Sequence, residues 1–79
     1  MLSKEMEGAL NEQVNKEFYS AYLYLAMASW FAERNLPGFA RWMRVQFQEE
    51  QLHALRFFDY ILSRGGKATL GAVATAPQD

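Results

Sequence analysis

Hydrophobic residues recur at alternating spacings of four and three along two long stretches of the chain, with one break between them. The stripe in the first stretch reads Met6, Leu10, Val14, Glu17, Ala21, Tyr24 and Ala28. The stripe in the second stretch reads Phe39, Met43, Gln46, Glu50, His53, Phe57 and Tyr60. Such spacing keeps side chains on one face of an α-helix. The pattern therefore predicts two amphipathic helices with inward-facing stripes.

Residues typical of helix ends bound both stretches. Ser3 is suited to cap the first helix, because its side chain can accept a hydrogen bond from a free backbone N–H. Pro37 suits the first turn of a second helix, and Gly65–Gly66 suits its end. We therefore expect a single domain with a helix at about 3–35, a turn at 35–38, a helix at about 37–64 and a tail at 65–79.

So short a turn makes the two helices antiparallel, which predicts an all-α hairpin. The segment Phe18–Ala32 contains no charged residue and is apolar on nearly every face. It is too short to span a bilayer, which takes about 20 residues. A helix that is apolar all round is buried on several sides, and one partner helix cannot achieve this. We therefore expect the hairpin to assemble with other chains or to be a fragment of a larger protein.

The composition of the chain excludes several classes of function. The chain has 79 residues, a net charge of −1 and no cysteine. The absence of a basic excess argues against nucleic-acid binding, and the absence of cysteine excludes disulfides and thiolate metal sites. The N-terminal residues lack an apolar signal region, which predicts a cytoplasmic protein. A core of this size supplies only about 3–5 kcal/mol, so a metal or partner chains should add stability.

Three polar residues interrupt the inward stripes. Glu17 interrupts the first, and Glu50 and His53 interrupt the second, three residues apart on one helical face. Measured from Leu36 in the turn, Glu17 lies roughly 28 Å along its helix, while Glu50 and His53 lie roughly 21 and 26 Å along theirs. We therefore expect two carboxylates and one imidazole to converge inside the bundle.

A metal ion would remove most of the cost of burying these groups. Oxygen-rich ligands with one imidazole suit iron or manganese and, less specifically, zinc. A Glu on one helix with Glu-x-x-His on its neighbour is half of the dinuclear carboxylate set found in helical bundles. In the alternative interpretation, Arg44 or Arg56 pairs with Glu50, and His53 is a hydrogen-bonded core residue.

With these residues placed, the chain resembles the N-terminal half of bacterial non-haem ferritins from Met1 to about Gly66. The resemblance to the first ferritin helix rests on Leu10-Asn11-Glu12-Gln13 and Glu17-Phe18-Tyr19-Ser20-Ala21-Tyr22-Leu23-Tyr24. The resemblance to the second rests on Gln48-Glu49-Glu50-Gln51-Leu52-His53 and Phe58-Asp59-Tyr60. Motif, spacing and turn position agree together.

The resemblance implies a ferroxidase, which oxidises iron(II) with dioxygen or peroxide at a di-iron centre and stores it as a ferric mineral. It implies that Glu17 and His53 bind the first iron and that Glu50 bridges both. Tyr24 matches a tyrosine beside the centre, although its spacing equally fits a core aromatic. Glu49 matches an acidic residue at a third iron site, although it also fits an exposed surface charge.

Two departures from the family stand out. Haem-binding relatives carry a methionine after the bridging Glu, whereas this chain has Gln51, so we expect no haem. The third and fourth helices, which hold ligands of the second iron, have no counterpart here. The resemblance implies that the hairpin is half of a ferritin-like four-helix bundle. Either the chain is the first half of a ferritin, or two hairpins pair into such a bundle, as a homodimer or larger assembly, with two copies of Glu17, Glu50 and His53. A structural assembly module without redox chemistry is the alternative function.

Overall fold

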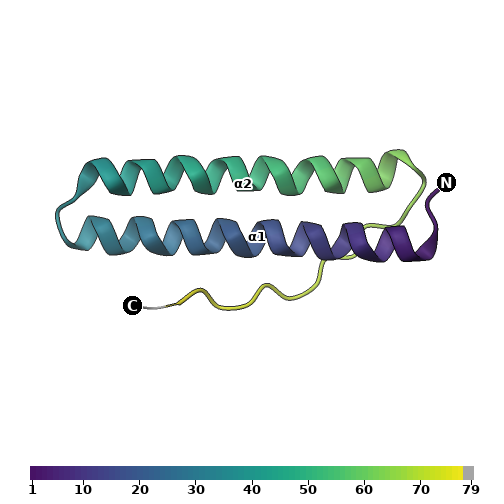
Figure 1. Cartoon of the computed structure of the whole chain (residues 1–79), viewed down its shortest axis with the longest axis horizontal. Coiled ribbons are helices and arrows are strands. Elements are labelled where there is room, and N and C mark those ends of the chain that lie inside the picture. Colours follow the sequence, from purple (N-terminus) through teal and green to yellow (C-terminus); the bar gives the residue numbers. More distant parts are fainter. Residues whose placement is uncertain (78–79) are drawn as a thin grey trace.

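The computed structural model describes residues 1–77 as two antiparallel helices followed by an extended tail (Figure 1). Helix α1 covers Lys4–Glu33, and helix α2 covers Pro37–Ser63. The Cα atoms extend over 49 × 19 × 12 Å, and the long dimension is close to that of a 30-residue helix. No strand occurs in residues 1–77. The prediction of an all-α hairpin is confirmed.

Both helices end at a residue with left-handed backbone geometry. Asn35 has φ 58° after α1, and Gly65 has φ 75° after α2. Asparagine and glycine tolerate this region better than other residues. At the end of α2, the Gly66 N–H then donates to the Ile61 carbonyl at 2.9 Å, which completes a Schellman motif. Because Asn35 belongs to the corresponding motif of α1, that helix ends at residue 33, two residues before the predicted end.

Small and β-branched side chains form the seam between the helices. The buried residues recur seven apart on each helix, as in antiparallel coiled coils, and are Val14, Ala21 and Ala28 on α1 and Ala54 and Ile61 on α2. Alanine leaves little side chain between the backbones, so the helices can approach closely along the seam. Larger apolar residues, including Phe18 and Phe57, pack against its edges.

The predicted stripes do not coincide with this seam. Met6, Phe39 and Tyr60 belong to the stripes but are 51%, 52% and 44% exposed in the hairpin. In α2 the seam is carried instead by Ala54 and Ile61. The physical reason is that two helices bury only one edge of each stripe. The rest of each stripe forms an open face that flanks the seam.

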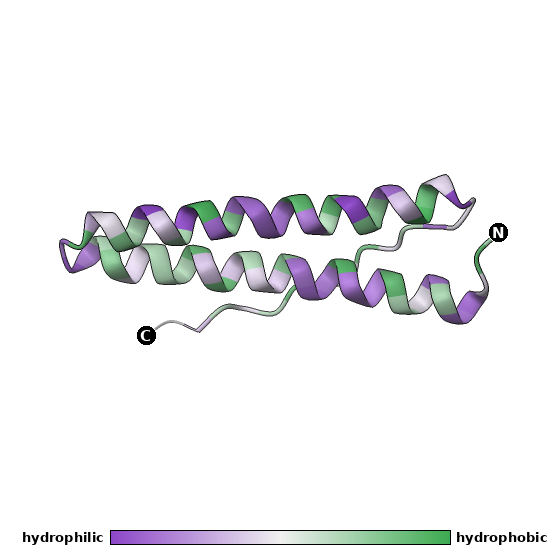
Figure 2. Cartoon of the chain, turned by 45° about the horizontal axis from the view of Figure 1, so that its top comes forward, coloured by the Kyte–Doolittle hydropathy of each residue, from purple (hydrophilic) through white to green (hydrophobic). Residues whose placement is uncertain are grey.

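The half of α1 nearest the turn has almost no strongly hydrophilic residue (Figure 2), in line with the uncharged segment Phe18–Ala32. Several of its large apolar side chains are still exposed, among them Tyr22, Leu25 and Trp30. In residues 1–77, neither helix is long and apolar enough to cross a membrane. These exposed apolar side chains form a surface on which further helices could pack.

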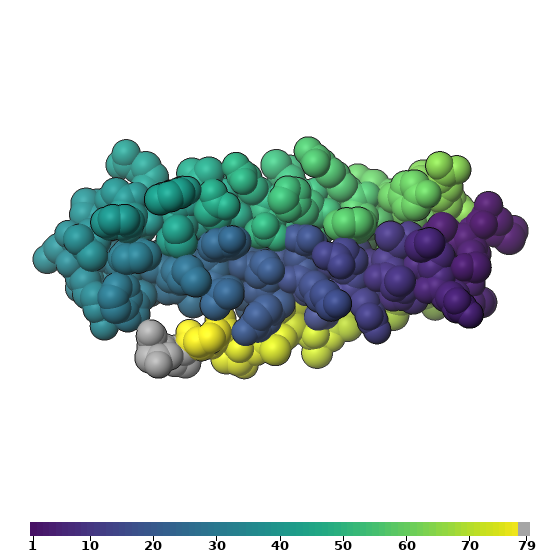
Figure 3. Space-filling model, viewed as in Figure 1, coloured from purple at the N-terminus to yellow at the C-terminus, as the bar shows by residue number. Residues whose placement is uncertain are grey.

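The segment after α2 first passes behind the start of α1, where Ala68 packs against the core, and then runs along the side of α1 away from α2 (Figures 1 and 3). Side chains one helical turn apart on α1 hold it. Asn11 Nδ2 donates to the Lys67 carbonyl at 3.0 Å, and Asn11 Oδ1 accepts from the Thr69 N–H at 2.8 Å. Asn15 Nδ2 donates to the Ala72 carbonyl at 2.7 Å. The tail is therefore a fixed strap rather than a free end up to this point.

Replacing Asn11 with alanine should loosen the strap, because it removes two of these hydrogen bonds. We expect the Thr69 amide to exchange with solvent roughly fivefold faster, which corresponds to about 1 kcal/mol. Hydrogen exchange followed by NMR measures this rate. Glu12→Ala, at an exposed neighbouring position, is the matched control. Equal exchange in both variants would contradict the role of Asn11.

Candidate metal centre

Glu17, Glu50 and His53 lie together on the open face of the hairpin. Glu17 comes from α1, while Glu50 and His53 come from successive turns of α2. Each offers one ligand atom, and these atoms all lie within 4.8 Å of one another. The seven-residue repeat of the seam sets the register of the helices and thereby brings Glu17 level with the other two. In residues 1–77 this is the one group of three or more acidic, histidine or cysteine side chains that could hold a metal ion.

The imidazole points one nitrogen toward both carboxylates. His53 Nδ1 lies 3.7 Å from Glu17 Oε2 and 3.5 Å from Glu50 Oε1. The two carboxylate side chains are 17% and 16% exposed, whereas His53 is 44% exposed. The carboxylates therefore lie deeper, and the imidazole covers them from the solvent side. Oxygen and imidazole ligands of this kind suit iron, manganese or zinc.

Each of the two carboxyl groups shifts the pKa of the other. The hydrogen bond with Glu50 lowers the pKa of Glu17, with smaller contributions from Gln13 and His53, while burial opposes the shift. The same hydrogen bond with Glu17, together with burial and the charge of Glu17, raises the pKa of Glu50. Glu50 therefore keeps its proton at a higher pH than an isolated glutamic acid. Two carboxylates this close favour a structure with either one proton or one cation between them.

The other predicted site residues lie outside this group. Tyr24 is half-buried two helical turns after Glu17, and Glu49 is exposed. In the described part of the chain, neither Arg44 nor Arg56 forms an ion pair with Glu50, whose ionic contact is His53. The interpretation in which an arginine neutralises Glu50 is therefore not supported.

The sequence analysis overlooked Gln13, which lies one turn before Glu17. Its Nε2 donates a hydrogen bond of 2.9 Å to Glu17 Oε1. The available signal was the spacing of four residues between a carboxamide and a carboxylate on one helix, which allows such contacts. That signal is weak, because many helices contain the same spacing without a hydrogen bond.

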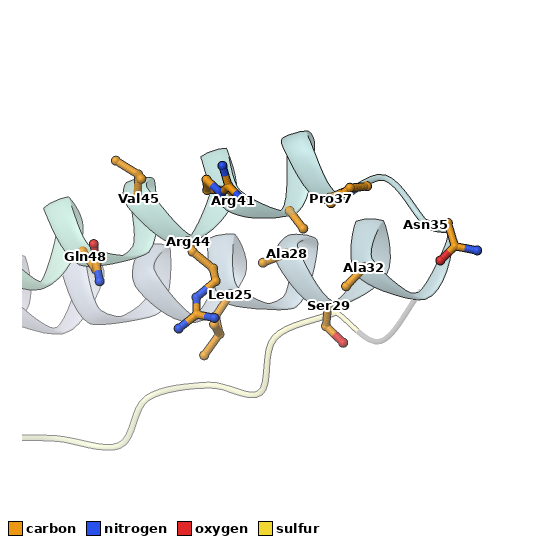
Figure 4. A pocket seen from close by; sticks show the side chains of 11 residues that line it. Leu25, Ala28, Ser29, Ala32, Asn35, Pro37, Arg41, Arg44, Val45 and Gln48 are labelled. Carbon is orange, nitrogen blue, oxygen red and sulfur yellow. The ribbon is translucent and has the colours of Figure 1, made fainter.

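A hollow of the hairpin lies elsewhere, between the end of α1 and the start of α2. It is an open groove of about 740 Å³, lined by Leu25, Ala28 and Val45 among others, with Arg41, Arg44 and Gln48 along its length (Figure 4). None of its lining residues is acidic or a histidine. The groove therefore has no ligands for a metal cation.

Comparison with known proteins places this arrangement in a family. The family described as "Ferritin-like domain" matches residues 7–79. The bacterial non-heme ferritin of Bacteroides fragilis strain 638R is 42% identical over 77 residues, which cover 98% of this chain and 48% of that protein. The corresponding ferritin of Staphylococcus saprophyticus is 44% identical over 73 residues, covering 92% of this chain and 44% of that protein.

Solved structures of ferritins also resemble this chain. An open-pore ferritin from the hyperthermophilic archaeon Archaeoglobus fulgidus superposes with a TM-score of 0.97 at 52% identity, covering 100% of this chain and 49% of that one. A humanized archaeal ferritin superposes with a TM-score of 0.98 at 48% identity, again over 100% of this chain and 48% of that one. The chain thus spans about half the length of the relatives it matches.

Metal binding at this centre should depend on pH, because an ion must displace the proton held by Glu50. The pKa of Glu50 is raised above its ordinary 4.5, so its proton still competes with the metal at pH values where a free glutamic acid is ionised. We expect the apparent affinity for Co²⁺ to rise with pH through this range and proton release to accompany binding. Calorimetric titrations in buffers of different ionisation enthalpy count the protons. Binding without proton release would contradict the raised pKa of Glu50.

Proposed function

The chain belongs to the ferritin-like family, and from that premise we propose that it binds iron(II) at Glu17, Glu50 and His53 and oxidises it to iron(III). One observation carries the proposal: three ligand atoms from two helices lie within 4.8 Å of one another. Each iron(II) gives up one electron, and two irons together reduce dioxygen with two protons to hydrogen peroxide. We propose storage of the ferric product as the purpose of this chemistry. The cytoplasmic location expected from the sequence stays a prediction.

We assign separate roles to the three residues. Glu17 and His53 hold the first iron, and Glu50, between them, bridges to the second. The raised pKa of Glu50 supports this role, because its carboxyl group lies where burial and Glu17 both oppose a second negative charge. A cation reverses this preference and lets both carboxylates ionise. We propose further roles for Tyr24 as an electron donor and for Glu49 as a ligand of a third iron.

A dinuclear centre needs more ligands than one hairpin holds. We propose that a second half-bundle supplies them, either as a second copy of this chain or as the remainder of a longer ferritin. Two copies would bring together four carboxylates and two imidazoles, the number found in symmetric dinuclear bundles. The open face supports this arrangement, because Phe39 and Tyr60, which belong to the same stripe of α2 as Glu50 and His53, are about half exposed.

A structural assembly module is the second candidate. Its support is that the carboxyl groups have partners without a metal: Gln13 donates to Glu17, and Glu17 and burial raise the pKa of Glu50, which favours its neutral form. No buried side-chain nitrogen or oxygen in residues 1–77 lacks a hydrogen-bond partner. In this interpretation the cluster serves only to pair helices.

Replacing Glu50 with alanine separates the two functions. If the centre oxidises iron, Glu50→Ala should reduce the rate of iron(II) oxidation at least 100-fold, because the bridging ligand is lost. Stopped-flow absorption at wavelengths where ferric species absorb measures this rate under air. Glu12→Ala, which removes an exposed carboxylate on α1, should oxidise iron at the original rate. Unchanged oxidation in Glu50→Ala would favour the structural module.

Completion by a second copy predicts an assembly with an even number of chains. Native mass spectrometry of the 79-residue chain, loaded anaerobically with iron(II), should show such assemblies with about two irons per pair of chains. A monomer that binds iron would contradict completion by a second copy. An assembly without iron would contradict the iron site itself.

A further inference from the structure

Gln13 is the polar neighbour of the metal centre to which the proposed function gives no role. It lies one helical turn before Glu17 on α1 and is half-buried. Its Nε2 donates a hydrogen bond of 2.9 Å to Glu17 Oε1. Water could satisfy a half-exposed carboxamide equally well, so the consequence of this bond is the orientation of Glu17 more than the stability of the helix.

The bond gives the two oxygens of Glu17 different surroundings. Oε1 faces Gln13, while Oε2 faces His53 Nδ1 at 3.7 Å. The oxygen that faces the other ligands is therefore the one without the carboxamide. Rotation of the carboxylate that would bring both oxygens toward an ion would break the bond to Gln13.

We infer that Gln13 is a positioning residue that holds Glu17 as a one-oxygen ligand, with Oε2 presented to the metal and Oε1 held away from it. This inference rests on the proposed metal centre. Hydrogen-bond partners of this kind orient metal ligands in many sites, and their loss typically weakens metal binding about 10–100-fold.

The chemistry of the side chain fits this role. A carboxamide donates a hydrogen bond without carrying charge. Lysine or arginine at position 13 would neutralise Glu17 and repel a cation, whereas glutamate could not donate to an ionised Glu17. Asparagine has the same amide group but is one methylene shorter, so it would not reach Glu17 across one helical turn.

Two variants of Gln13 test the inference. Gln13→Met keeps the length and the helix-forming tendency of the side chain but removes the hydrogen-bond donor. Gln13→Asn keeps the amide donor but shortens the side chain by one methylene, so that the donor no longer reaches Glu17. The probe is Co²⁺, whose visible absorption reports the number of coordinating atoms. We expect both variants to bind Co²⁺ about 10-fold more weakly than the original chain. We also expect an altered visible spectrum, because Glu17 can then offer both oxygens.

Gln48→Met is the matched control, since Gln48 is exposed and lines the groove away from the metal centre (Figure 4). It should bind Co²⁺ with the original affinity and spectrum. Circular dichroism compares the helix content of the variants. If one of the two Gln13 variants loses its helices, the Co²⁺ affinity of the other is compared with that of the original chain. If both folded variants bind as the original chain does, the role of Gln13 is wrong while the metal centre stands. If the original chain binds no Co²⁺, the metal centre itself is wrong, and the role of Gln13 with it.

Discussion

The close contact of α1 and α2 along a seam of mostly small residues is the constraint on which the rest of the structure depends. Val14 packs with Ala54 and Ile61 in one buried cluster, Ala21 and Ala28 continue the seam toward the turn, and all five are at most 5% exposed. Their seven-residue repeat fixes the rotation and the register of each helix. Because Glu17 lies between Val14 and Ala21, and Glu50 and His53 lie just before Ala54, the same register that buries the seam brings the three polar side chains level.

Burial and charge then act against each other at the centre. The helices place two carboxyl groups together with little exposure, so the pKa of Glu17 is lowered and that of Glu50 is raised. A bound cation would relieve the repulsion between them, since it interacts favourably with both carboxylates and the imidazole at once. Gln13 orients the Glu17 carboxylate, because it donates a hydrogen bond to Oε1 while Oε2 faces the centre.

The two sides of the hairpin differ. The strap after α2 is fixed to α1 by Asn11 and Asn15, which lie on a face of the helix turned away from Glu17. Within residues 1–77 no such strap covers the face of the metal centre, and large apolar residues such as Phe39 and Tyr60 are exposed on it. This face is therefore the one open to further helices. This asymmetry agrees with a hairpin that forms half of a larger bundle.

The sequence alone determined the two helices, their antiparallel order and the meeting of Glu17, Glu50 and His53, because helical periodicity and rise are local properties. The ferritin resemblance was confirmed by the comparisons, since its motifs are also local. Only the tertiary structure decided which part of each stripe is buried. It left Phe39 and Tyr60 exposed, since burial depends on how many helices pack together. The hydrogen bond from Gln13 and the course of the strap likewise depend on side-chain rotamers and on contacts between residues far apart in the sequence, which no periodicity records.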